Sequence, residues 1–139
     1  MPSRLAIVAR VNDIAAYNNS LEAAPGEIVA ELLRLIQAGL PDTEGKVWHG
    51  HPVWFLEGNP IVGYSVKAGG VELLFWSGQS FSTPGLKAVG KFKAAGKSFT
   101  EAAGIDAQQI RAWLTESVVI QWDYANLPKK RSLEKLTSF

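Results

Sequence analysis

Cysteine is absent from this sequence, and histidine and methionine are scarce, with two and one residues respectively. The lack of cysteine excludes disulfides, thiolate metal sites and a thiol nucleophile. A disulfide-free domain fits a reducing compartment, so we expect a cytoplasmic protein. Long apolar runs are missing as well, because none reaches the roughly 18 residues that span a bilayer. We therefore expect no membrane partner, and the short apolar stretch 5–9 is too brief for a signal peptide.

An excess of charge is also lacking, since 14 Lys and Arg stand against 13 Asp and Glu. This balance argues against a dedicated nucleic-acid-binding protein, which carries a marked basic excess. Aromatic residues, in contrast, are plentiful, with five Trp, six Phe and three Tyr. A chain of 139 residues with 47% hydrophobic content can build one packed core. We expect a single domain.

The first half of the chain carries a helical pattern. Pro25 suits the first turn of a helix, and Gly39 followed by Pro41 predicts its end. The spacing therefore predicts a helix over residues 25–38 with one apolar, core-facing stripe, formed by Ile28, Val29, Leu32, Leu33, Leu35 and Ile36. A shorter helix is expected at residues 14–17, after an Asn or Asp cap.

From Lys46 onward the pattern changes to short β-branched and aromatic runs. They predict strands over residues 47–49, 53–56, 61–67, 71–76 and 97–100, with a hairpin turn at 68–70. Asp106 followed by Gln109 predicts a capping box at the start of a last helix. Together these elements predict an α+β domain whose antiparallel sheet has about four to six strands, with N-terminal and C-terminal helices packed on it.

Tryptophan and histidine side chains gather on the first strands of this predicted sheet. If they line a concave face, they form a candidate pocket for a small ligand or a protein partner, made of Trp48, His49, His51, Trp54 and Trp76. Aromatic residues in strands also commonly build the core, and that alternative stays open. No nucleophile motif surrounds the nearby serines at 77, 80 and 82, so we expect a binding domain rather than an enzyme.

The two histidines raise a second hypothesis, metal handling. Residues two apart in an extended strand share a face, so His49 and His51 could bind one iron or zinc ion. A third ligand, such as Asp42 or Glu44, would have to complete the site. A structural role for both imidazoles is the alternative.

A lysine-rich segment raises a third hypothesis. Gly96-Lys97-Ser98 is not a phosphate loop, because position 91 is lysine where that motif needs glycine. The surrounding segment nevertheless contains several lysines with glycines and phenylalanines between them. It forms a candidate anion or nucleic-acid loop through Lys87, Lys91, Lys93 and Lys97. An ordinary solvated loop is the alternative.

The order of several motifs resembles the YdhG-like family, domain of unknown function 1801 (DUF1801). These motifs are the Tyr17 helix, Ala24-Pro25, Leu40-Pro41, Gly50-x-Pro52-x-Trp54, Gly63-Tyr64, Leu73-Leu74-Phe75, Gly90-Lys91 and Ile105-Asp106. The resemblance covers about residues 11–122, which implies a domain core over that range and a tail over residues 123–139. It implies a compact α+β fold with a curved antiparallel sheet, and it implies no catalytic residues. Some relatives are frataxin-like, which implies iron handling along an acidic ridge. The state of association, monomer or homodimer, stays open.

Overall fold

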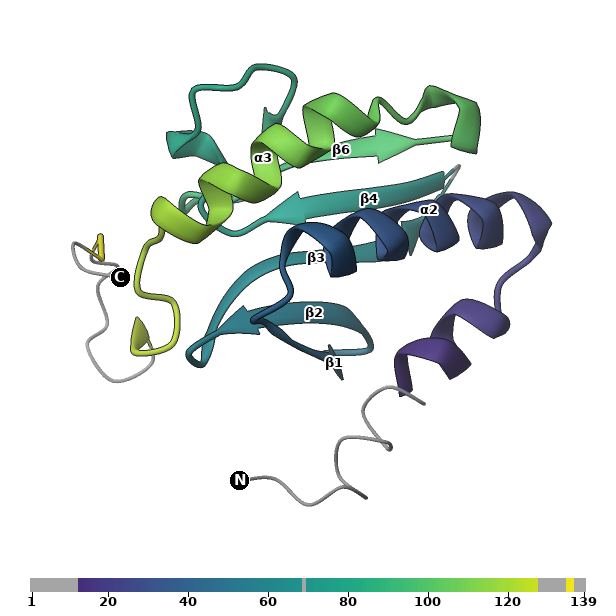
Figure 1. Cartoon of the computed structure of the whole chain (residues 1–139), viewed down its shortest axis with the longest axis horizontal. Helices are drawn as coiled ribbons and strands as arrows, with labels where there is room; N and C mark the ends of the chain where they lie inside the picture. The colour runs from purple at the N-terminus through teal and green to yellow at the C-terminus, as the bar shows by residue number, and fades with distance from the viewer. Residues whose placement is uncertain (1–12, 69, 128–134, 137–139) are drawn as a thin grey trace.

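The computed structural model describes residues 13–68, 70–127 and 135–136. A short helix over residues 13–19 comes first. It is followed by α2 (Ala23–Gly39), β1 (Glu44–Trp48), β2 (His51–Leu56), β3 (Asn59–Lys67), β4 (Gly70–Phe75), η1 (Gly78–Ser80), β5 (Lys87–Ala88), β6 (Ala95–Phe99), η2 (Ala102–Gly104) and α3 (Ala107–Val119) (Figure 1). The apolar stretch 5–9 and most of the predicted tail lie outside the described residues.

The strands form one six-stranded antiparallel sheet in the order β1-β2-β3-β4-β6-β5. Successive strands up to β4 pair with their neighbours in the chain, and β5 adds an outer edge beyond β6. Figure 1 shows α2 and α3 side by side on one face of this sheet. The predicted α+β fold, with helices packed on an antiparallel sheet, is confirmed.

Helix α2 forms because its apolar residues recur at helical spacing and can be buried together. Ile28, Val29, Leu32, Leu35 and Ile36 are all buried, whereas Leu33 of the predicted stripe is only partly buried. Removing each such side chain from water contributes roughly 1.5–3 kcal/mol. The helix ends where the backbone N–H of Leu40 donates to the carbonyl of Ile36 at 2.8 Å.

Helix α3 begins at the predicted N-cap. The carboxylate of Asp106 accepts hydrogen bonds from the backbone N–H groups of Gln108 and Gln109, at 3.1 and 3.2 Å. A cap of this kind stabilises a helix by about 1 kcal/mol. The side chain of Gln109 does not complete the predicted capping box. Its amide instead donates to the carbonyl of Pro84 and accepts from Lys97 Nζ, because these polar groups from distant segments lie within reach.

Two tight turns join the first three strands. His49 and Gly50 connect β1 to β2 with φ angles of 51° and 85°. Glu57 and Gly58 connect β2 to β3 with φ angles of 50° and 83°. Positive φ at both central residues is what a type I′ hairpin turn requires. The chain therefore reverses at His49, where the sequence had predicted a strand.

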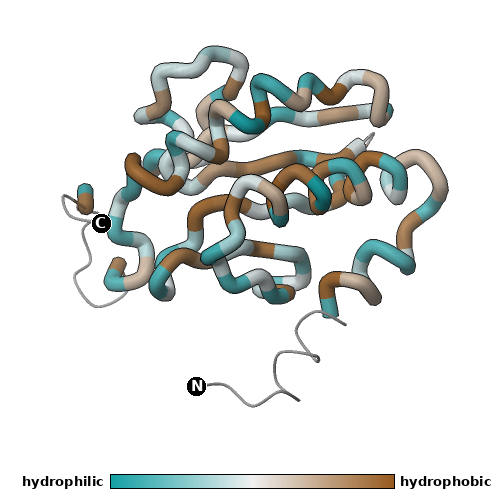
Figure 2. The backbone as a smooth tube through the Cα atoms, viewed as in Figure 1, coloured by the Kyte–Doolittle hydropathy of each residue, from teal (hydrophilic) through white to brown (hydrophobic). Residues whose placement is uncertain are grey.

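The main core lies between the sheet and the two long helices. Strand residues Trp54, Val62, Tyr64, Leu73 and Phe75 pack there against the buried sides of α2 and α3. Figure 2 shows the hydrophobic colouring concentrated on the central strands and along α2. Within the described residues, no helix combines the length and apolar character needed to cross a membrane.

A buried polar network ties the segment after α3 to the sheet. The side-chain amide of Asn59 donates to Gln121 Oε1 at 2.9 Å and to the carbonyl of Trp122 at 3.0 Å. Its oxygen accepts from the backbone N–H of Ala125 at 3.0 Å. Farther along, the N–H of Leu136 donates to the carbonyl of Gln121. The packed structure thus extends past residue 122, the predicted end of the core.

Candidate binding surface

Neither α2 nor α3 covers the second face of the sheet, which we call the open face. Side chains alternate between the two faces along each strand, so the open face carries the residues that alternate with the main core. The strand register places there Lys46, Trp48, His51, Val53, Phe55, Gly63, Ser65, Glu72, Leu74 and Ser98. This face is therefore a mixture of aromatic, aliphatic and polar side chains.

Three rings on the open face, those of Trp48, Phe55 and Trp76, pack together as an aromatic cluster. The centroids of Trp48 and Phe55 are 5.3 Å apart with an edge-to-face angle of 77°, and those of Trp48 and Trp76 are 6.3 Å apart. Phe55 is buried, whereas both indoles are half-buried and keep exposed surface. The ammonium of Lys46 lies 4.7 Å from the centroid of Phe55, a cation–π contact at the margin of the cluster.

Glycine at position 63 makes room for this cluster. A Cβ atom there would lie 3.3 Å from the ring of Trp76 and 2.7 Å from the carbonyl oxygen of Pro52. The indole of Trp76 therefore lies over β3 where that strand has no side chain. Trp76 thus packs against the backbone of Gly63.

The two histidines do not lie in one strand, which corrects the geometry assumed for a shared metal site. His49 is exposed in the turn and its ring contacts that of Trp48, with centroids 4.2 Å apart, whereas His51 begins β2. Burial is the largest influence on His51 and lowers its pKa below the usual 6.5. Its Nδ1 is buried without a hydrogen-bond partner of good geometry among the described residues. The imidazole of His51 is therefore mostly neutral at pH 7.

Acidic residues do not gather around these imidazoles in the described part of the chain. No group of three or more His, Asp or Glu side chains there is placed to hold a metal ion. Iron or zinc binding by His49 and His51 stays a prediction that the described geometry does not support.

Trp54 lies on the opposite face of the sheet from Trp48, His51 and Trp76. It is only 4% exposed and its ring contacts that of Tyr64 in the main core, with centroids 5.6 Å apart. One edge of its indole borders a pocket of about 320 Å³, between α2, β1 and the helix over residues 13–19. The five predicted residues therefore divide between two surfaces. Trp48, His49, His51 and Trp76 belong to the open face or its margin.

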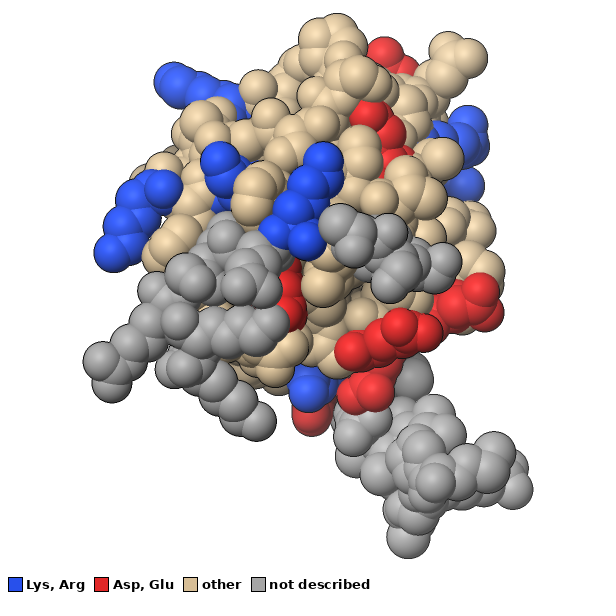
Figure 3. All heavy atoms as spheres, turned by 90° about the vertical axis from the view of Figure 1, so that its left-hand side faces the viewer, with Lys and Arg blue, Asp and Glu red and all other residues tan. Residues whose placement is uncertain are grey.

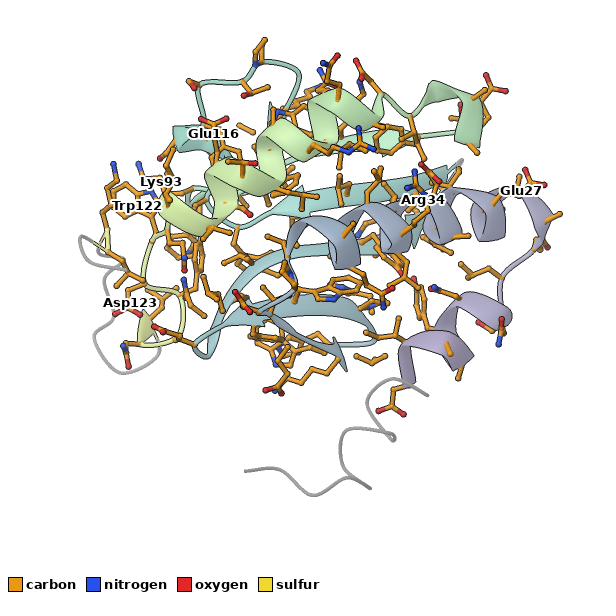
Figure 4. The ribbon with its side chains drawn as sticks, in the orientation of Figure 1. Glu27, Arg34, Lys93, Glu116, Trp122 and Asp123 are labelled. Atoms are coloured by element: carbon orange, nitrogen blue, oxygen red, sulfur yellow. The ribbon has the colours of Figure 1, made fainter. Side chains whose placement is uncertain are left out.

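The four lysines of the predicted anion loop also diverge. Lys97 points to the helix-covered side, where its Nζ donates to Gln109. Lys87 lies on the edge strand β5. Lys91 and Lys93 are in the loop before β6, each stacked on an aromatic ring: Lys91 on Phe92 and Lys93 on Trp122. Figure 4 shows Lys93 beside Trp122 at one end of the molecule, and Figure 3 shows the basic side chains of that end separated by uncharged surface.

Some residues that shape these surfaces were missed by sequence reasoning. Lys46 and Phe55 belong to the open face, and period-two alternation from Trp48 and Val53 would have indicated both. Asn59 and Gln121 were missed as buried polar residues, being 4% and 1% exposed. No local pattern marks them, because their partners come from distant parts of the chain.

No known protein family matches this sequence, and no curated protein is detectably similar to it. The fold, however, is similar to the crystal structure of YdhG from Bacillus subtilis, which is described as a protein from the DUF1801 family. The two chains are 15% identical and superpose with a TM-score of 0.56, over 87% of this chain and 93% of the other. The predicted resemblance is thus confirmed at the level of the fold. That description names no activity or ligand, so the function must be argued from the residues themselves.

Proposed function

We propose that this protein is a non-enzymatic binding domain that docks a protein partner on its open face. The observation that carries the proposal is the aromatic cluster, in which Trp48 and Trp76 keep exposed indole surface on a sheet face that α2 and α3 leave uncovered. Tryptophan is among the residues most enriched at the energetic centre of protein interfaces.

The surroundings of the cluster match the anatomy of such an interface. Polar and charged residues of both signs border it, including Lys46, Ser65 and Glu72. An apolar, aromatic centre with a polar rim is the usual arrangement at protein–protein contacts. The mixed charge of the rim favours a partner with charges of both signs over a polyanion.

A flat protein surface suits this face better than a small ligand does. The rings of Trp48 and Trp76 contact each other, with 6.3 Å between centroids. A ligand ring inserted between two others needs roughly twice the 3.5–4.0 Å contact distance. The two indoles therefore form a continuous surface and leave no slot for a ring to enter.

The test is a comparison of three tagged variants as bait in lysate of the source cell. Trp48→Ala and Trp76→Ala remove the indoles, and Val119→Ala is the matched control, since Val119 is a 61% exposed apolar residue on α3. We expect a protein that wild type and Val119→Ala retain and both tryptophan variants lose. With that partner purified, each tryptophan change should weaken binding and raise the dissociation constant by about 30-fold. An unchanged set of bound proteins, with folding verified by circular dichroism, contradicts the proposal.

Anion contact is a second candidate function, supported by the stacking of Lys93. Its Nζ lies 4.8 Å from the centroid of Trp122, so a positive charge and an aromatic surface stand together at this end of the molecule. The side chain of Phe92, which is 41% exposed, lies in the same loop. Single-stranded nucleic acids bind such combinations, with affinity that falls as salt rises. A fluorescent oligothymidylate titrated at low and high salt tests this, and Lys93→Ala should reduce the salt dependence.

A further inference from the structure

The pocket beside Trp54 lies on the helix-covered side of the sheet, remote from the open face. Its volume is about 320 Å³, and its apolar wall includes Ile14, Leu33 and Leu40. Ligand sites typically combine such apolar walls with a few fixed polar groups. An apolar cavity of about 150 Å³ can hold benzene, so this pocket has room for a substituted aromatic ring.

The polar group that distinguishes the pocket is the indole N–H of Trp54. Gly45 also lines the pocket, and a Cβ atom on it would lie 2.5 Å from Nε1. The N–H edge of the indole therefore packs against the backbone of Gly45, at the wall of the pocket. Nε1 donates to no acceptor among the described residues, and it is not one of the fully buried atoms there that lack a partner, so it stays accessible although the side chain is only 4% exposed. Buried tryptophans usually find a partner for this donor. The donor is thus fixed in place and available to a ligand.

The lining also limits the charge of the ligand. Among the residues that the structure describes, the lining includes no Asp, Glu, Lys, Arg or His, and Gln37 and Thr43 supply its remaining side-chain polar atoms. A buried charge without a partner is strongly unfavourable. We propose that this pocket binds a small, uncharged, largely apolar molecule whose carbonyl oxygen accepts a hydrogen bond from Trp54 Nε1. This site is independent of the function proposed for the open face.

Three probes of nearly equal shape test the proposal. Acetophenone carries the neutral carbonyl, α-methylstyrene replaces that oxygen with a methylene group, and benzoate adds a charge. The readout is the indole ¹H–¹⁵N resonance of Trp54, assigned by its loss in Trp54→Phe or by nuclear Overhauser contacts to Gly45. We expect acetophenone to shift this resonance downfield and saturably. α-Methylstyrene should bind roughly fivefold to tenfold more weakly, and benzoate more weakly still.

Two adjacent alanines supply matched controls. Ala15 lines the pocket and Ala16 does not, and both are exposed on the helix over residues 13–19. Ala15→Phe should fill the pocket and abolish acetophenone binding, whereas Ala16→Phe and Trp48→Ala should leave it unchanged. The proposal is overturned if acetophenone at millimolar concentration leaves the Trp54 resonance in place or if Ala15→Phe still binds. Equal affinity for the two neutral probes, or tighter binding of benzoate, also overturns it.

Discussion

The carboxylate of Glu116 on α3 accepts two hydrogen bonds from Ser82, one from the backbone N–H at 2.7 Å and one from the hydroxyl at 2.8 Å. A third comes from the backbone N–H of Thr83 at 3.0 Å. One side chain thereby holds the loop between η1 and β5 against the helix, at the position labelled in Figure 4. The nearby indole of Trp113 donates to the carbonyl of Thr83 and adds a second attachment.

This attachment should weaken in acid. Burial, the largest single influence, raises the pKa of Glu116, but the hydrogen bonds from Ser82 and Thr83 together outweigh it and lower that pKa below 4.5. A lowered folded-state pKa stabilises the fold fully above the ordinary value and loses that effect as pH falls through the folded-state pKa. The free energy of unfolding of wild type and Glu116→Gln, measured by urea titration at several pH values, should therefore converge below pH 4.5. A constant difference down to the folded-state pKa contradicts this.

Asn59→Ala should destabilise the protein by about 3 kcal/mol, because it leaves buried partners on Gln121 and Trp122 unsatisfied. The measurement is urea unfolding followed by tryptophan fluorescence. Gln79→Ala is the matched control, since the exposed Gln79 amide also makes two hydrogen bonds, to the carbonyls of Phe92 and Ala94. We expect that change to cost less than about 1 kcal/mol, because water replaces the lost partner. Equal losses in the two variants would show that burial does not decide the effect.

Glu57→Asn should stabilise the second hairpin by about 0.5–1 kcal/mol. Glu57 has a positive φ of 50°, which strains most side chains, and Asn-Gly is a preferred pair for this turn. His49→Asn relieves the same strain in the first hairpin but removes the ring contact with Trp48. Its gain should be smaller. Thermal unfolding of both variants measures the difference, and a lower melting temperature for Glu57→Asn refutes the strain argument.

Gly63→Ala should destabilise the protein by about 1–3 kcal/mol, because the added methyl group would lie 2.7 Å from the carbonyl oxygen of Pro52, which must shift, and 3.3 Å from the ring of Trp76. Gly104→Ala is the control, since nothing lies within 4 Å of a Cβ at that position. It should leave the free energy of unfolding nearly unchanged. Chemical denaturation of both variants measures the two free energies of unfolding. A Gly63→Ala protein as stable as the control would contradict the close packing of Pro52 and Trp76 around Gly63.

The long helices and the β3–β4 hairpin could be predicted because their signals are local. The apolar spacing of α2 and the cap at Asp106 each lie within a few consecutive residues. The β1–β2 hairpin was missed, because His49-Gly50 does not match the Asn-Gly or Asp-Gly pair that usually marks such a turn. Reading His49 and His51 as one strand placed them on one face, and the turn between them removes that geometry.

The candidate surfaces depended on information that no short stretch of sequence contains. A one-residue change of register reverses the face of every side chain in a strand, so Trp54 and Trp48 could not be assigned to faces from composition alone. Likewise, Lys97 lies beside Gln109 only because β6 and α3 pack together. The sequence by itself determined the fold class, the long helices and the aromatic content of the strands, because periodicity and capping act locally. Only the tertiary structure decided which aromatics share the open face, which residue borders the pocket and which polar groups are buried, because strand register and long-range packing set those relations.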